Sequence, residues 1–95
     1  MHHYKGKRGR LEKYASILAA VQYDTLRPSH IMIRASLKHY DLESLLKNLT
    51  KMNMVTLGPD AVGINVSIAE SGTNWLNLYR LLTYWMEGDP ELQSV

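Results

Sequence analysis

The chain has 95 residues, no cysteine and a net charge of only +2. This length suits one domain whose core is near the lower limit for independent stability, so a second copy would add useful burial. The absence of cysteine excludes disulfides and thiolate metal sites. No apolar run approaches the ~18 residues that a membrane span needs, so we expect a soluble, cytoplasmic protein with no membrane partner.

The charge is unevenly distributed along the chain. Residues 1–38 contain eight basic and two acidic residues (+6), whereas residues 39–95 contain three basic and seven acidic residues (−4). Concentrated positive charge favours a polyanionic partner, and mixed charge with an acidic excess is typical of a solvated surface. The first third of the chain is therefore where a polyanion would be held.

The segment MHHYKGKRG, residues 1–9, has two glycines and no apolar periodicity, and it predicts a flexible basic arm. Basic residues placed near DNA phosphates bind by releasing condensed counterions. The candidate phosphate contacts in and next to the arm are Lys5, Lys7, Arg8 and Arg10. The alternative interpretation is a tail that only improves solubility.

Two helices are predicted next. The sequence RLEKYASILAAVQY, residues 10–23, has apolar residues at helical spacing, and Pro28 forces an end to the helix before it. Leu26 is expected in a short extended segment. A second, short helix over residues 29–35 is expected to use Ser29 as N-cap and to bury Ile31, Met32 and Ala35.

The stretch PSHIMIRASLKHYDLESLLKNLTKMNMV, residues 28–55, predicts a helix-turn-helix with its turn at residues 35–37. The second helix starts at Lys38, and its buried stripe is Leu42, Leu45, Leu46, Leu49 and Met52. In DNA-binding proteins of this type the second helix enters the major groove. Its outward positions here are Lys38, His39, Tyr40, Asp41, Glu43, Ser44, Lys47 and Lys51.

A β-hairpin follows, with strands at residues 54–57 and 64–69 and a loop of about six residues, GPDAVG. Alternation of Ile64, Val66 and Ile68 with polar residues indicates a half-buried strand. Three helices followed by a hairpin form a winged helix, so residues 10–69 are predicted to be the winged helix-turn-helix domain. The wing loop has no basic residue and adds Asp60.

The segment over residues 70–88 contains a last helix, TNWLNLYRLLTYWME (73–87), and a tail follows at 89–95. Apolar side chains lie nearly all around this helix, more than one small domain can cover. We expect a homodimer through a coiled-coil seam on this helix. The candidate interface is Trp75, Leu78, Tyr79, Leu82, Trp85 and Met86. The alternative is that the helix is buried wholly within one chain.

The segments RGRLEKYASILAAV, HIMIRASL, KMNMV and SIAESGTNWL together resemble small archaeal winged-helix proteins, over roughly residues 8–86. That family includes chromatin-associated proteins of Sulfolobus and transcription-regulator-like domains. The resemblance implies a nucleoid-associated DNA binder, either a regulator or a chromatin protein, that dimerises through its last helix as an antiparallel coiled coil. The acidic residues Asp41, Glu43 and Asp60 depart from the family pattern.

Double-stranded DNA is therefore the predicted partner. Phosphate contacts are expected from the arm and from Arg34, Lys38, Lys47 and Lys51, and base contacts from His39, Tyr40 and Ser44, with Lys47 able to reach guanine. The alternative is a winged helix that binds a protein and has little DNA affinity. The sequence shows no nucleophile with a base, no phosphate loop and no metal-ligand pair, so we expect no enzyme, no cofactor and no metal.

Overall fold

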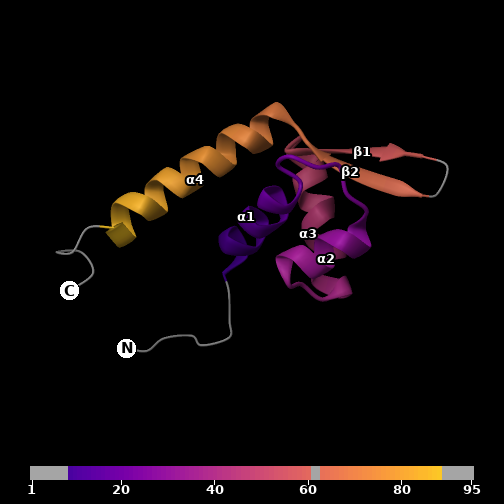
Figure 1. Cartoon of the computed structure of the whole chain (residues 1–95), viewed down its shortest axis with the longest axis horizontal. Helices are drawn as coiled ribbons and strands as arrows, with labels where there is room; N and C mark the ends of the chain where they lie inside the picture. Colours follow the sequence, from indigo (N-terminus) through magenta and orange to yellow (C-terminus); the bar gives the residue numbers. More distant parts are fainter. Residues whose placement is uncertain (1–8, 61–62, 89–95) are drawn as a thin grey trace.

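The computed structural model describes residues 9–60 and 63–88, and it contains four helices and one antiparallel hairpin within them (Figure 1). The elements are α1 (Arg10–Ala20), α2 (Pro28–Ala35), α3 (His39–Lys51), β1 (Val55–Pro59), β2 (Ile64–Ile68) and α4 (Glu70–Gly88). The predicted, mostly helical α+β fold with a winged helix-turn-helix and a C-terminal helix is confirmed. The arm at residues 1–8 and the tail at 89–95 lie outside the described residues.

Helix α1 ends at Ala20, three residues before the predicted end. The chain then reaches Leu26, which exchanges backbone hydrogen bonds with Val66 of β2, so the predicted extended segment adds one bridge to the hairpin. The predicted N-cap at Ser29 is wrong. Helix α2 begins at Pro28, and the capping position is Arg27, with no side-chain cap. Proline at the first helical position leaves one fewer N–H group to satisfy, so a capping side chain is less needed there.

The turn between α2 and α3 is made by Ser36, which has left-handed backbone angles (φ 54°, ψ 52°). The amide of Leu37 then donates to the carbonyl of Met32 at 3.0 Å, which ends α2. Four of the five predicted stripe residues of α3 are buried: Leu42, Leu45, Leu46 and Leu49. The fifth, Met52, is 45% exposed. It lies past the end of α3, where the chain turns through Asn53, so the helical spacing no longer applies to it.

The hairpin is longer and its loop shorter than expected. Strand β1 continues through Gly58 to Pro59, which pairs with Ile64, so that only residues 60–63 connect the strands. The loop is closed by the Asp60 amide, which donates to the Gly63 carbonyl at 2.7 Å. Proline is tolerated at the end of an edge strand because no ladder bond from its nitrogen is needed there.

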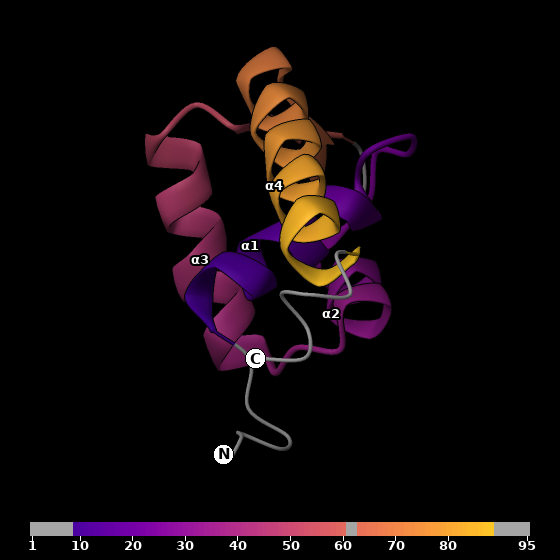
Figure 2. The same ribbon diagram turned by 90° about the vertical axis from the view of Figure 1, so that its left-hand side faces the viewer.

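Helix α4 starts at Glu70, three residues earlier than predicted. Its start is held to the turn just before β1: the Ala69 amide donates to the Met54 carbonyl (2.9 Å) and the Ser71 hydroxyl to the Asn53 carbonyl (2.6 Å). Buried Gly72 allows this close approach. Leu76 inserts into the core formed by α1, α2, α3 and the hairpin. The rest of α4 passes α1 and projects beyond it (Figures 1 and 2).

Candidate nucleic-acid interface

Helix α3 presents a ridge of exposed side chains on the side opposite its buried leucines. The ridge consists of Tyr40, Ser44, Lys47 and Lys51, all exposed. Their spacing of four, three and four residues places them on one side of a helix. His39 and Glu43 are exposed beside the ridge, and Lys38 precedes the helix. The structure thus brings together the α3 residues predicted to face outward, with the exception of Asp41.

Two hollows border this ridge. One, of about 870 Å³, lies between α3 and the hairpin and is called here the wing-side groove. The other, of about 270 Å³, lies between α3 and α1 and is called the α1-side cleft. Tyr40 and Ser44 line both hollows, which confirms that the ridge separates them. Figure 2 shows α3 and α1 side by side.

The wing-side groove has an apolar floor and a basic rim. Leu46 forms part of the floor, and Leu57 and Ile64 of the hairpin leave their side chains exposed in it. Lys47 and Lys51 stand at the rim, and within the described part of the chain neither has a carboxylate at ion-pair distance. The sequence pattern did not reveal this groove, because it forms only when the hairpin folds back beside α3.

The α1-side cleft is polar. It is lined by Arg10, Lys13, Tyr40, Asp41, Ser44, Leu45 and Asn48. Lys13 Nζ and Asp41 Oδ2 form an ion pair at 3.3 Å, with side chains 27% and 36% exposed. The Asn48 amide donates to the Tyr14 hydroxyl at 3.0 Å, which adds a second link between the two helices.

The sequence prediction for Asp41 is therefore wrong. It was expected on the outward face of α3, and the structure instead places it half-buried on the flank that meets α1. Lys13, its partner, was not a candidate site residue. The seven-residue spacing of Asp41 and Asn48 indicates a shared polar flank, but only the packing of α1 shows which residues face it.

The remaining predicted phosphate contacts are more scattered. Arg34 pairs with Asp24 at 3.1 Å and lines neither hollow, and Lys38 also lies outside both. Arg10 lines the α1-side cleft. Lys5, Lys7 and Arg8 fall outside the described residues.

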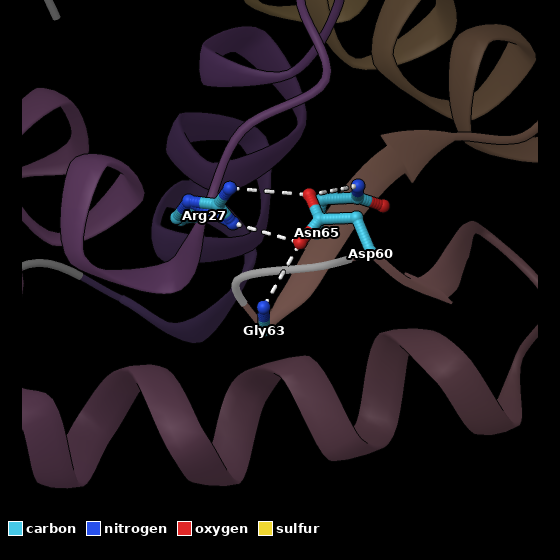
Figure 3. A network of polar contacts seen from close by, with 4 residues as sticks. All are labelled: Arg27, Asp60, Gly63 and Asn65. Carbon is cyan, nitrogen blue, oxygen red and sulfur yellow. Dashed lines mark hydrogen bonds and ion pairs between the residues drawn. The ribbon is translucent and has the colours of Figure 1, made fainter.

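The wing is held by a polar network centred on Asp60 (Figure 3). One carboxylate oxygen lies 3.1 Å from Arg27 Nη2, and the other accepts from Arg27 Nη1 at 3.4 Å. The same carboxylate accepts from the Gly63 amide at 2.9 Å and from the Asn65 side-chain amide at 3.1 Å. The acid that departs from the family pattern in the wing loop is thus paired with Arg27, and it ties the hairpin to the segment before α2.

One apolar face of helix α4 is exposed in the part of the chain that the structure describes. Trp75 and Tyr79 stack with ring centroids 5.3 Å apart and pack, partly buried, against the core. Leu78, Leu81, Leu82 and Trp85 are all 44% exposed or more. Their spacing of three, one and three residues is that of a coiled-coil stripe. The predicted interface residues therefore fall into two groups: Trp75 and Tyr79 pack against the core, whereas the others are exposed. Leu81, which was not among the predicted interface residues, belongs to the exposed group. Met86, which is also exposed, directly follows Trp85 and lies one turn after Leu82.

Two other kinds of site, a metal centre and a membrane-spanning helix, are absent from residues 9–60 and 63–88. No group of three His, Cys, Asp or Glu side chains lies close enough there to hold a metal ion. Among the helices described, none combines the length and the apolar character needed to cross a membrane.

No protein-family model matches the chain, and no curated protein matches it in sequence. Solved structures do match. Sso10a-2, a DNA-binding protein from Sulfolobus solfataricus, has a TM-score of 0.79 at 16% identity, over 85% of this chain and 84% of that one. The transcriptional regulator BldR, also from Sulfolobus solfataricus, has a TM-score of 0.65 at 16% identity, over 86% of this chain and 65% of its own.

A third similar structure is MepR, a transcription regulator of the Staphylococcus aureus multidrug efflux pump MepA. Its TM-score is 0.70 at 20% identity, over 87% of this chain and 62% of that one. A variant of MepR has been solved bound to an oligodeoxyribonucleotide, with a TM-score of 0.69 at 20% identity, over 84% of this chain and 60% of that one. This chain thus spans a little under two thirds of the length of MepR and BldR. The likeness shows that the chain has the winged-helix fold found in these DNA-binding proteins and regulators.

Proposed function

We propose that the protein binds double-stranded DNA by placing the α3 ridge in the major groove. The observation that carries the proposal is the ridge itself. Lys47 and Lys51 have no ion pair there with any described residue, and two further basic residues, Arg10 and Lys13, lie across the helix. An α-helix with its side chains is about 10–12 Å wide, close to the ~12 Å width of the major groove. The DNA-binding and regulator proteins that share the fold support the proposal.

In this proposal the residues divide into two roles. Arg10, Arg34, Lys38, Lys47 and Lys51 contact phosphates, together with Lys5, Lys7 and Arg8 of the arm. His39, Tyr40 and Ser44 face base edges, and Lys47 can reach the acceptors of guanine. Either a transcription regulator or a nucleoid-associated chromatin protein would use this arrangement.

The active form in this proposal is a homodimer joined through α4. The open stripe of Leu78, Leu81, Leu82 and Trp85 supports it, because exposed apolar stripes at coiled-coil spacing are costly to leave in water. Two-fold symmetry is the commonest way for a small soluble chain to cover such a stripe. A dimer would present two α3 ridges to two half-sites of one duplex.

Titration of a DNA duplex at two salt concentrations tests the function. Binding is expected to weaken as salt rises, with a slope of about 0.9 per phosphate contact. Lys47→Gln and Lys51→Gln should each lower that slope by about one. Arg80→Gln is the matched control, because Arg80 lies on α4, bonded to Gln22 and outside both hollows. Absence of binding at low salt would reject the proposal.

The wing-side groove favours a second candidate, a winged helix that binds a protein partner. Exposed Leu57 and Ile64 line the groove, and apolar side chains gain little from a phosphate backbone. A protein partner would cover them. The two candidates differ in the salt titration of a DNA duplex: a winged helix that binds a protein is expected to show little affinity for the duplex even at low salt.

A further inference from the structure

We infer that the α1-side cleft is a second phosphate site, in which Lys13 is shared between a DNA phosphate and Asp41. The inference rests on the proposed DNA binding by α3 and extends it to a part of the molecule outside the helix-turn-helix. It also assigns Asp41 a role in lowering the affinity for DNA.

The position of the cleft follows from the geometry of α3. A helix in the major groove is bordered by two phosphate backbones, one on each side. The wing-side backbone would meet Lys47 and Lys51 at the rim of the wing-side groove. The opposite flank of α3 is the α1-side cleft, so the other backbone would lie at its mouth. Because Tyr40 and Ser44 line both hollows, the ridge borders the cleft directly among the described residues.

The chemistry of the cleft suits a phosphodiester. The exposed guanidinium of Arg10 and the ammonium of Lys13 supply charge, and the Ser44 hydroxyl supplies a hydrogen-bond donor. Helix α1 also begins here, at Gly9, with no side-chain cap. Among the described residues no side chain caps the first N–H groups of α1, and the positive end of the helix dipole also attracts an anion.

Asp41 opposes this site through its ion pair with Lys13. At 3.3 Å the carboxylate neutralises the lysine that a phosphate would otherwise use. An ion pair with more than a quarter of each side chain exposed contributes little free energy in water. A phosphate can therefore compete with Asp41 for Lys13 with only a small loss of free energy. Asp41 then lowers the affinity for any DNA sequence, since the contact involves only the backbone.

The experiment is a double-mutant cycle on duplex binding, measured at several salt concentrations with the full chain. Arg10→Gln and Lys13→Gln are each expected to reduce the salt slope by about one. Asp41→Asn is expected to raise the affinity in the parent chain and to have a much smaller effect in the Lys13→Gln background. Circular dichroism of each variant verifies that the helices are retained.

Glu43→Gln is the matched control, because Glu43 is an exposed acid on the wing-side flank of the same helix. Its effect on affinity should be the same with and without Lys13. If Asp41→Asn also acts equally in both backgrounds, or if the Arg10 and Lys13 variants keep the parental slope, the second phosphate site is rejected while DNA binding stands. If the parent chain does not bind the duplex at all, the proposed function fails first.

Discussion

At the scale of single residues, Asp60 shows how the meaning of a charge depends on its neighbours. In the sequence it is an acid in a wing loop without basic residues. In the structure its two carboxylate oxygens bind Arg27 and accept hydrogen bonds from Gly63 and Asn65, so it holds the wing in place (Figure 3). The partner Arg27 is 33 residues away in the chain, a distance at which no sequence spacing predicts a contact.

Replacing Asp60 by Asn should lower the free energy of unfolding by about 1 kcal/mol, because the charge is lost and an amide has one acceptor oxygen instead of two. Urea denaturation followed by circular dichroism measures the change. Asp24→Asn is the control, since the Asp24–Arg34 pair is more exposed and its loss should cost less than about 0.5 kcal/mol. Equal losses in the two variants would contradict a special role for Asp60.

Gly72 has a steric role at the start of α4. A Cβ atom at this position would overlap the carbonyl oxygen of Met54. Gly72→Ala should therefore destabilise the fold by about 1–3 kcal/mol, although alanine is the better helix former. Asn77→Ala, at an exposed position of the same helix, should be neutral or slightly stabilising. Thermal melting of both variants checks the prediction, which a stabilised Gly72→Ala variant would contradict.

At the scale of elements, α4 has two distinct parts. Its beginning is bound to the domain through Gly72, Leu76 and the stacked Trp75–Tyr79 pair. Its later turns expose leucines and Trp85. The helix has 19 residues, about 28 Å, and is longer than the sequence predicted because its first turn is bonded to the turn just before β1. One helix thus stabilises the monomer and offers a surface for association.

The double variant Leu81→Glu, Leu82→Glu is expected to convert the proposed dimer into a folded monomer. Both side chains are exposed in the single chain, so the change should leave its core intact. Sedimentation equilibrium gives the mass, and circular dichroism gives the helicity. Arg80→Glu, at an exposed position of α4 that hydrogen-bonds to Gln22 and lies outside the open stripe, should keep the dimer. A dimer that survives the double variant would exclude this seam. Trp75→Ala is a poorer test, because Trp75 also packs against the core.

At the scale of the whole molecule, the basic residues surround α3 rather than concentrating on it. Lys47 and Lys51 border the wing-side groove, Arg10 and Lys13 border the α1-side cleft, and the arm is attached next to that cleft at Gly9. This distribution suits binding to the phosphate backbone of DNA that depends little on the DNA sequence, with contacts to base edges limited to the short ridge on α3.

Deleting residues 1–9 should lower the salt slope of DNA binding by up to about three, one for each of Lys5, Lys7 and Arg8. The slope is obtained from fluorescence anisotropy titrations at several salt concentrations. A variant with Gly6→Ser alone serves as the control and should keep the slope of the parent chain. An unchanged slope after the deletion would show that the arm takes no part in binding.

The sequence alone determined the fold class and the order of the elements, because those depend on local patterns. Helical spacing identified the buried leucines of α3, and alternation with turn residues identified the wing. The tertiary structure decided what depends on contacts between distant segments: Asp41 with Lys13, Asp60 with Arg27, and which side of α4 is covered by the core. It also moved the helix ends and shortened the wing loop, since hydrogen bonds such as Ala69 to Met54 extend an element beyond its sequence signal. The periodicity of apolar residues along the sequence indicates which side chains are buried. Which charged side chains lie next to each other depends on how the helices and the hairpin pack, and the candidate DNA-binding site depends on those charges.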